Sequence, residues 1–548
     1  MPRKKTPAPA EPASSPQLEE NQRLSQSLLW QHERNFFDQQ GIQAWNSGAV
    51  PHYVTSNPTI ARAYANVILA HLRDWLQSGS LDPSQPLYIL ELGAGCGRFA
   101  FHCLGYLQRH LPHLGAALPP VVYLMGDFAQ RNLDYWQAHS HLQPFRESGL
   151  LDFAQVDASE IPSLTPLLSG QTLTADTLAN PLIAIANYFF DCLPQDAFAI
   201  QDGRLHESLI TLSLAENSEF GNQNAELNGE YHPELLDQLE IRFTDRPTDP
   251  EGYYEDADWN QILANYQANL TDTALLFPCT ALRCLQQLHQ LSQGHLLFLS
   301  ADKGTSRLQD LLDRPRPGLS RHGSGFSLMV NYHAIGQYAQ KLGGTWLSAP
   351  HRHASINING FLFGEADQAF PQTQQAYAEQ IRDGGPDDFF ALKKGLEPHY
   401  AALTLPQLLA FLRLSHWDSN IFLRCFPALM QKLEKASPTV FLDVYAAVEQ
   451  VWLNYFPIQE QRDLAFLLGM VLYAIEYYPE ALEFLQTSLQ RYGEEASTFY
   501  NMAMCHYRLR QLESALACIE QTLALDPEFE AARAKRIQWQ AELTRKAH

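Results

Sequence analysis

The sequence lacks a long basic run, a closely spaced pair of cysteines and a long apolar segment. Its 548 residues hold 60 Asp and Glu against 38 Lys and Arg, a net charge of −22. Such an acidic chain repels phosphate backbones, so nucleic acid is not expected as a substrate or partner. The eight cysteines form no C-x-x-C pair and lie scattered through apolar segments, which favours buried free thiols in a reducing compartment.

No apolar run approaches the length of a membrane-spanning helix, and the best one, residues 182–190, is interrupted by Asn187. Residues 1–22 are rich in Pro, Ala and Ser and contain no apolar core, so they are expected to form a disordered tail and not a signal peptide. The sequence therefore predicts a cytoplasmic protein with no membrane span. Its length favours two or three domains.

The chain is organised around residues 87–100, LYILELGAGCGRFA. An apolar, β-prone run leads into a turn of small residues, and helical spacing follows it. Such a loop lets the backbone approach a ligand and directs the free N–H groups of the helix start at it. A dinucleotide-binding fingerprint needs a third glycine at the position where this chain has Arg98. A P-loop needs Gly-Lys-Ser/Thr after the glycines, and this tripeptide does not follow. Neither of these two nucleotide motifs is therefore present.

Together with Glu91, the loop resembles the E-x-G-x-G-x-G pattern of S-adenosylmethionine-dependent methyltransferases. This cofactor has a ribose diol, an adenine and a methionine zwitterion, and each needs its own partner. We expect Glu91 to accept from the ammonium, Asp127 from the ribose hydroxyls and Asp157 from the adenine edge. The main chain of the loop would approach the sugar and methionine portions of the cofactor through Gly93, Ala94, Gly95 and Gly97.

Strands are expected at residues 87–90, 121–125, 150–156, 181–186 and 295–299, each leading to a polar residue. Their alternation with helical patterns predicts an α/β fold, a Rossmann-like class I methyltransferase sheet with helices on both faces. Such sheets bind ligands at the carboxyl ends of their strands.

The residues that follow the fourth strand, Asn187, Tyr188 and Asp191, are the expected catalytic residues. They lie where the sulfonium methyl group would be presented to the acceptor. Methyl transfer is an in-line displacement, so the enzyme supplies alignment, desolvation and, where needed, proton removal.

The combination of VTSNP, ELGAGCGR, an acid after the second strand and ANYFFDCLPQDAF resembles the MidA family of methyltransferases, over residues 26–364. This family is related to the mitochondrial methyltransferase that assists respiratory complex I assembly. The resemblance implies methylation of arginine in a partner protein, and a guanidinium needs a nearby carboxylate. The family usually has Asn-Glu where this chain has Asn187-Tyr188. Asp191 or Asp196 would then supply the missing carboxylate.

The predicted organisation is a methyltransferase domain at 23–365, a linker at 366–402 and a helical repeat domain at 403–548. Within the first domain, the acidic segment 201–278 is expected to be an insertion or lid beside the site.

The repeat domain resembles tetratricopeptide repeats, helix pairs whose small residues permit close packing. The two clear units are expected at about 465–498 and 499–532, and such repeats would bind a protein substrate or an assembly partner. The period is 34 residues, and it relates Gly469, Ala481, Leu482 and Leu489 to Ala503, Ala515, Leu516 and Leu523.

Three functions are compatible with these features. The first is a protein methyltransferase whose repeats hold its substrate or partner. The second, motivated by Tyr188, is an inactive methyltransferase fold that serves as a scaffold. The third is a small-molecule methyltransferase in which the lid encloses the substrate. No metal site is expected, because the pairs His351/His353 and His110/His113 have no cysteine or carboxylate at metal-ligand spacing in the sequence.

Overall fold

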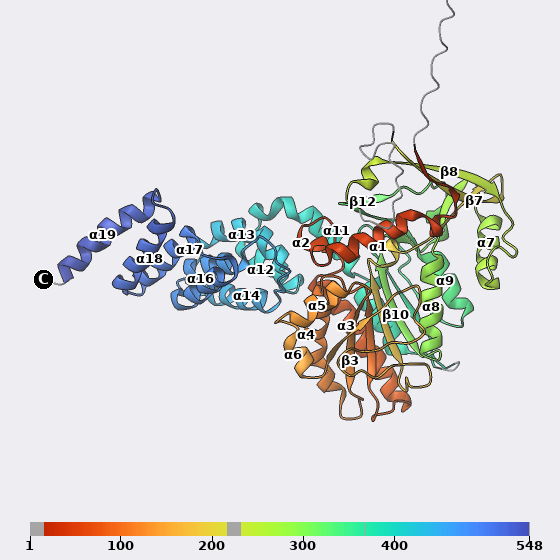
Figure 1. The fold of residues 1–548 in the computed structure, drawn as a ribbon. Helices are drawn as coiled ribbons and strands as arrows, with labels where there is room; N and C mark the ends of the chain where they lie inside the picture. The colour runs from red at the N-terminus through yellow and green to blue at the C-terminus, as the bar shows by residue number, and fades with distance from the viewer. Residues whose placement is uncertain (1–15, 216–231, 366–367, 547–548) are drawn as a thin grey trace, which may run out of the picture. The chain divides into compact units, whose positions relative to one another are not determined.

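The structure, a computed structural model, describes residues 16–215, 232–365 and 368–546, so most of the predicted tail lies outside the described residues. The chain divides into two compact units. The first comprises residues 1–56 and 63–387, and the second comprises residues 57–62 and 388–548. Figure 1 shows the β-sheets in the first unit and the helices α12 to α19 in the second.

The first unit is built on a seven-stranded sheet of order β15-β16-β10-β5-β2-β3-β4. The pairs from β10 to β4 are parallel, whereas β16 pairs antiparallel with both β10 and the edge strand β15. Every residue of β2 and β10 is buried, as expected for parallel strands covered on both faces. The prediction of a parallel α/β sheet is therefore confirmed. The strands are β2 (Leu87–Leu92), β3 (Val121–Asp127), β4 (Leu151–Gln155), β5 (Leu182–Asn187), β10 (Leu296–Asp302), β15 (Thr345–Leu347) and β16 (Asn357–Leu362).

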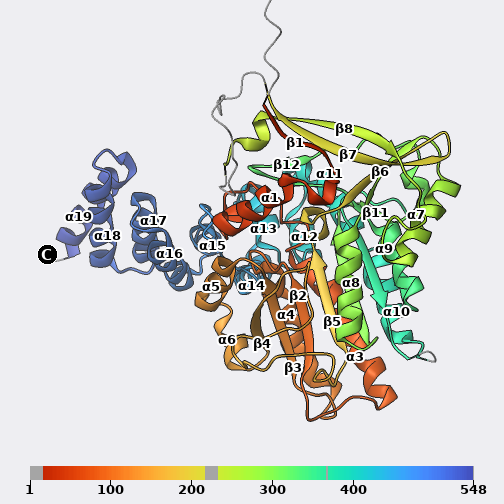
Figure 2. The same cartoon turned by 45° about the vertical axis from the view of Figure 1, so that its right-hand side comes forward.

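Helices cover both faces of this sheet (Figure 2). On one face, α8 (Cys279–Leu291) and α9 (Tyr332–Lys341) pack against Leu90 and Ala184 in the main apolar cluster. On the other, Trp136 of α5 (Gln130–Ala138) stacks on Phe153 of β4. Other helices of the first unit include α3 (Pro58–Ser78), α4 (Arg98–His110) and α6 (Gln143–Glu147).

A second, antiparallel sheet has the order β1-β7-β6-β9, with β8 also paired to β7. Together with α7 (Ala257–Asn269), it accounts for most of the described part of the segment expected to be an insertion or lid, of which residues 216–231 lie outside the described residues. Residues 17–22 were predicted to belong to the tail but form β1, because Leu18 packs into the apolar cluster of this sheet and Glu19 accepts from the Leu28 N–H at 2.9 Å. The strands are β1 (Gln17–Gln22), β6 (Asp196–Gln201), β7 (Arg204–Leu214), β8 (Leu239–Pro247) and β9 (Thr273–Phe277).

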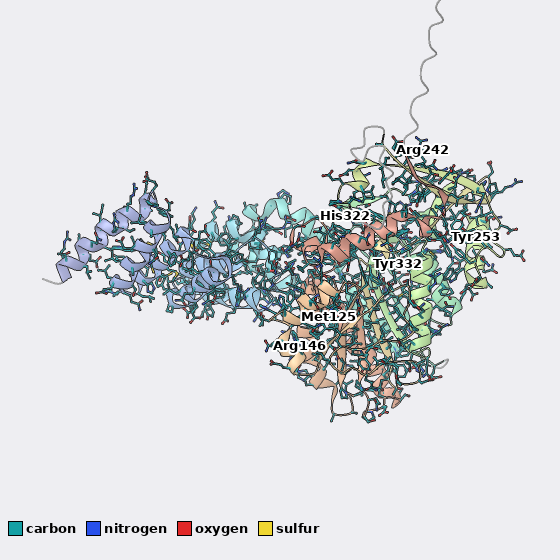
Figure 3. All side chains as sticks on the ribbon, viewed as in Figure 1. Met125, Arg146, Arg242, Tyr253, His322 and Tyr332 are labelled. Carbon is teal, nitrogen blue, oxygen red and sulfur yellow. The ribbon has the colours of Figure 1, made fainter. Side chains whose placement is uncertain are left out.

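Side chains fill the space between these layers. In Figure 3, Met125 and Tyr332 lie inside the first unit, and neither is exposed to solvent. Two further helices, α1 (Leu28–Gln40) and the short α2 (Gln43–Asn46), supply side chains to the space at the carboxyl ends of the central strands. The segment that precedes the predicted sheet thus contributes to the site that the sheet forms.

The stretch expected to be a linker, residues 366–402, contains α10 (Pro371–Tyr377) and α11 (Pro386–Leu396). The start of α10 is fixed by a buried contact with α3. The Asp74 carboxylate of α3 accepts from the backbone N–H of Thr373 at 2.8 Å and from its hydroxyl at 2.7 Å. The Gln-rich composition of this stretch does not indicate the contact with Asp74, because Asp74 lies almost 300 residues away in the sequence.

The second unit is helical, and its packing uses small residues where the 34-residue period predicts them. A Cβ atom on Gly469 would lie 3.1 Å from Cγ of Leu485, and Ala503 and Ala515 have no exposed surface. Among the described residues, no helix is long and apolar enough to cross a bilayer. The helices are α12 (Leu405–Leu414), α13 (Ser419–Leu433), α14 (Phe441–Leu453), α15 (Leu464–Ala474), α16 (Tyr478–Tyr492), α17 (Ala496–Arg508), α18 (Leu512–Leu525) and α19 (Glu530–Lys546).

Candidate functional site

The glycine loop between β2 and α4 adopts a backbone that only glycine takes easily. Gly93, Gly95 and Gly97 have φ angles of +63°, +51° and +76°. A Cβ atom on Gly93 would lie 2.5 Å from Cδ2 of Phe189, and Gly97 is the N-cap of α4. The glycines are therefore needed both for the turn and for the close approach of neighbouring side chains.

Replacing Gly93 by alanine is expected to lower the free energy of unfolding by about 3 kcal/mol, since left-handed strain and a clash with Phe189 add together. Gly149 is a matched control, because its φ is +76° but a Cβ atom there would meet nothing within 4 Å. Gly149→Ala should cost only about 1 kcal/mol. Urea unfolding of both variants measures the difference, and equal losses would contradict the clash.

Two adjoining cavities open at this loop. The loop cavity is lined by Gly93, Ala94, Gly95 and Glu91 together with Asn187, Tyr188 and Asp191. The strand-end cavity is lined by Asp127 and Asp157. Gly93, Tyr188 and Trp45 line both. The structure thus places the predicted site residues around one continuous region, with Gly97 behind the loop against Trp136.

Glu91 lies at the end of β2 and is buried. Its Oε2 accepts from the Tyr123 hydroxyl at 2.8 Å. Burial raises the pKa of Glu91 to about 8, and the hydrogen bond from Tyr123 opposes this only in part. Burial therefore favours the neutral form of this side chain, and a cation placed beside it would favour its ionised form.

Asp127 ends β3 with its carboxylate directed by two hydrogen bonds. Oδ1 accepts from the Ala129 N–H and Oδ2 from Nδ2 of Asn132, both at 3.0 Å. Burial raises the pKa of Asp127, and these hydrogen bonds work against the rise. Backbone hydrogen bonds from Gly95 and Phe128 also lower the pKa. The carboxylate lines the strand-end cavity and can accept hydrogen bonds from a ligand there.

Asp157 is more exposed than Asp127 and is already paired. Its carboxylate contacts Nη1 of Arg34 at 2.6 Å and accepts from the Ser159 backbone N–H at 2.9 Å. Partial burial alone would raise the pKa of Asp157, but the hydrogen bonds from Ser159 and Arg34 outweigh it and lower the pKa. Asp157 is therefore already held by an ion pair and by Ser159 at the rim of the strand-end cavity.

Asn187 ends β5 and lines the loop cavity, and Tyr188 follows it and lines both cavities. The Asn187 side-chain oxygen accepts from the Tyr64 hydroxyl at 2.9 Å, while its Nδ2 is buried with no hydrogen-bond partner among the described residues. Tyr188 has a φ of +46°, a strained value for a residue with a side chain, and its backbone N–H donates to Ala301 at 2.8 Å. Such strain at a cavity is typical of functional sites.

Asp191 faces a second buried carboxyl group that the sequence did not single out as a site residue. Asp302, at the end of β10, accepts through Oδ2 from the backbone N–H groups of Phe189 and Phe190 at 3.2 and 3.1 Å. Burial raises the pKa of both Asp191 and Asp302, and repulsion from Asp191 raises that of Asp302 further. The pair therefore holds a proton at a pH where isolated carboxyl groups would have lost theirs.

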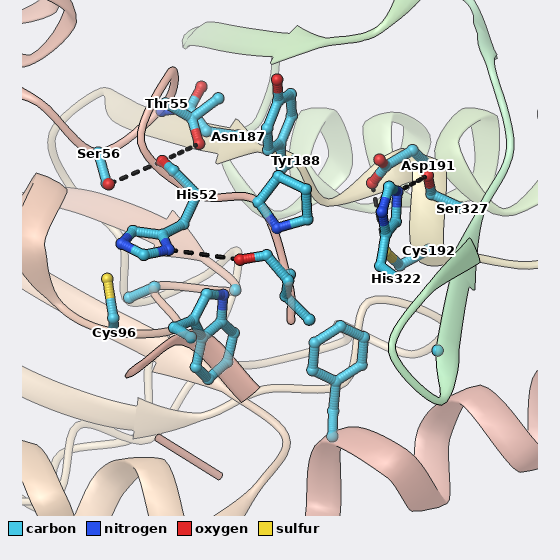
Figure 4. Close-up of a pocket in the computed structure, with 18 of the residues that line it drawn as sticks. His52, Thr55, Ser56, Cys96, Asn187, Tyr188, Asp191, Cys192, His322 and Ser327 are labelled. Carbon is cyan, nitrogen blue, oxygen red and sulfur yellow. Dashed lines mark hydrogen bonds between the residues drawn. The ribbon is translucent and has the colours of Figure 1, made fainter. Parts of the chain in front are cut away.

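Figure 4 shows the surroundings of Asp191. Cys192 donates to its Oδ1 at 3.3 Å, and Nε2 of His322 lies 3.0 Å from Oγ of Ser327. Asp196, the other carboxylate expected to serve in place of the family glutamate, accepts instead from the Tyr254 hydroxyl at 2.6 Å and belongs to β6. Of these two carboxylates, it is Asp191 that lines the loop cavity.

Glu33 of α1 also lines both cavities, and nothing in the helical pattern around it indicated this. Its Oε2 accepts from the Phe326 N–H at 2.8 Å. Burial raises the pKa of Glu33 well above its ordinary value, and the Asp191 charge adds to the rise. The loop cavity is thus lined by three acidic side chains, Glu33, Glu91 and Asp191, and by Lys303.

Two segments of the chain match known protein families. Residues 69–302 match the family model described as "Putative S-adenosyl-L-methionine-dependent methyltransferase", and residues 496–529 match a tetratricopeptide repeat model. No curated protein matches the chain. Residues 69–302 therefore belong to this methyltransferase family. The predicted enzyme class, the S-adenosyl-L-methionine cofactor and the helical repeats are confirmed.

Two similar solved structures come from Burkholderia thailandensis. One, bound to S-adenosyl-homocysteine, is 13% identical over 60% of this chain and 81% of that chain, with a TM-score of 0.37. The other, described as uncharacterized, is 12% identical over 64% of this chain and 89% of that chain, with a TM-score of 0.38. At this level of similarity, the family assignment rests on the sequence match.

Proposed function

We propose that this S-adenosylmethionine-dependent methyltransferase modifies a nitrogen atom of a protein side chain, arginine being the acceptor that the resemblance to the MidA family implies. The catalytic domain would comprise residues 23–365, and the repeats in residues 403–548 would recruit the protein that is methylated. The observation that carries this proposal is the pair of carboxyl groups, Glu33 and Asp191, in a cavity that adjoins the glycine loop.

The cofactor would span the two cavities. In this proposal, Asp127 and Asp157 in the strand-end cavity hold the ribose hydroxyls and the adenine edge, and Glu91 accepts from the ammonium group. Main-chain groups of the glycine loop contact the sugar and methionine portions. The methyl group would then face the loop cavity near Asn187 and Tyr188, which line it from the end of β5. This placement brings the donor beside the two acidic side chains.

An arginine acceptor explains why these acids lie there. A guanidinium is always protonated in proteins and is held well by carboxylates. Where the family has a glutamate this chain has Tyr188, and Glu33 supplies a carboxyl group from α1 instead. Lys303 lowers the pKa of Asp191 and so favours its ionised form, although burial dominates. Asp191 is therefore suited to accept the proton that the guanidinium loses on methylation.

The repeats offer a separate surface for the protein substrate. A groove between α14 and α16 is lined by three glutamates and by aromatic side chains. Carboxylates and aromatic faces both attract cationic groups, so this groove suits a basic protein segment. The lining residues that matter here are Glu449, Glu480, Glu483, Tyr445, Trp452 and Phe484.

The proposal is tested by incubating the purified full chain with methyl-tritiated S-adenosylmethionine and a cell extract, then identifying any labelled protein and its modified residue by mass spectrometry. We expect methylarginine. Label on a metabolite alone would favour a small-molecule methyltransferase. Absence of any transfer, with a protein still captured by the repeats, would favour the scaffold.

Charge reversal in the groove should separate recruitment from chemistry. Glu480→Lys combined with Glu483→Lys is expected to slow methylation of the protein substrate about 10-fold, since like charges would now face a basic segment. Cofactor affinity should not change. Glu513→Lys is the control, because Glu513 is an exposed glutamate of α18 that does not line the groove. Equal rates for all three proteins would remove the groove from the proposal.

A further inference from the structure

Two histidines and an aspartate converge at the start of α11, a part of the first unit that the methyltransferase site does not use. His351 and His353 lie on the segment between β15 and β16, and Asp387 lies in the first turn of α11. One potential ligand atom from each residue lies within 4.8 Å of the other two. The His353 Nδ1 atom is 3.8 Å from Oδ2 of Asp387. Sequence spacing alone did not reveal the cluster, because the carboxylate is distant along the chain.

The imidazole nitrogens of this cluster lack partners. Among the residues that the structure describes, Nε2 of His351 and both ring nitrogens of His353 are buried without a hydrogen-bond partner. Buried polar atoms are nearly always paired with protein, water or an ion. The two rings lie side by side, with centroids 5.1 Å apart.

Asp387 is held in place by the same segment of chain. Its Oδ2 accepts from the Ala354 N–H at 2.9 Å, and its Oδ1 accepts from the N–H groups of Ser355 and Ile356 at 2.6 and 2.9 Å. These hydrogen bonds explain the position of the carboxylate. They do not explain why two imidazoles with unpartnered nitrogens lie beside it. In metal sites, ligating carboxylates are commonly fixed by hydrogen bonds of this kind.

We propose that His351, His353 and Asp387 bind a divalent transition-metal ion of the zinc type. Two imidazoles and one carboxylate are a common ligand set for such ions, with water in the fourth position. Zinc–ligand distances of about 2.0–2.2 Å require the three atoms to move closer by roughly 1 Å. Near His353, Arg307 pairs with Asp310 at 2.7 Å. The ion would join the segment before β16 to the start of α11.

The test is calorimetric titration of the full chain, without a histidine tag and after treatment with a chelator, with Zn²⁺. We expect one ion per chain with a micromolar or lower dissociation constant. Co²⁺ should give the visible absorption of a four-coordinate site. His351→Gln combined with His353→Gln should weaken Zn²⁺ binding at least about 10-fold. Asp387 is left unchanged, because it also holds the backbone of residues 354–356.

The matched control is His110→Gln combined with His113→Gln, which removes a second histidine pair whose ring centroids are 6.1 Å apart. This variant should bind Zn²⁺ like the unaltered chain. Zinc should also raise the melting temperature of the unaltered chain but not that of the His351/His353 variant. Failure of the unaltered chain to bind Zn²⁺, or equal affinity in the two double variants, would overturn the proposal. Neither readout depends on methyl transfer.

Discussion

Asp127→Ala is expected to weaken binding of S-adenosylmethionine at least about 100-fold, because two charge-assisted hydrogen bonds to the ribose would be lost, each worth about 1.5–3 kcal/mol. Micromolar binding by the unaltered chain corresponds to about 8 kcal/mol, so a loss of this size leaves little signal in calorimetry. The structural reason is that the carboxylate is buried, directed by Ala129 and Asn132, and lines the strand-end cavity.

The control for this variant is Asp134→Ala. Asp134 lies on α5, close to Asp127 in the sequence. Its exposed carboxylate accepts a hydrogen bond from the Gln130 side chain of the same helix at 2.7 Å. It should bind the cofactor like the unaltered chain. Because Asp127 also orients the turn into α5, melting curves must show that Asp127→Ala remains folded. A folded Asp127→Ala variant with unchanged affinity would contradict the assignment of Asp127 to the ribose.

The central sheet could be predicted from sequence because its signals are local. Buried parallel strands are continuous apolar runs, and the strands at 87–92, 121–127 and 182–187 each occupy such a run. The glycine loop could also be predicted from its sequence, because a turn with three positive φ angles in five residues requires glycine at those positions. Strand-end carboxylates such as Asp127 follow from topology alone.

The parts that sequence did not reveal depend on contacts between distant segments. Glu33 has the same helical context as any polar residue of α1, yet the fold places it beside Asp191. Asp302 becomes a partner of Asp191 only because β10 pairs with β5. Leu18 and Glu19 were predicted to belong to the tail, because the sequence does not show their contacts with β7 and α1. No local pattern encodes such pairings.

Asp191→Asn is expected to slow methyl transfer by about 10²- to 10⁴-fold, the range typical of losing a general base, while cofactor affinity changes little. Asparagine keeps the shape of the side chain but cannot take a proton from the acceptor. Asp196→Asn is the matched control, since Asp196 accepts from Tyr254 and does not line the loop cavity. Its rate should stay within about 3-fold of the unaltered chain, in line with a substitution remote from the reacting atoms. Equal rates for the two variants would exclude Asp191 as the base.

The pH dependence provides a second, independent readout of the same residue. The base must be ionised to act, and burial raises the pKa of Asp191 above the ordinary value of about 4. Activity should therefore be full at higher pH and be lost as the pH falls through this raised pKa, well before an isolated aspartate would be protonated. Because Asp302 shares the buried proton, Asp302→Asn removes the carboxyl group that Asp191 faces and should shift this acidic limb of kcat/KM. An acidic limb that stays unchanged in Asp302→Asn would mean that another group, with Glu33 the nearest candidate, controls the reaction.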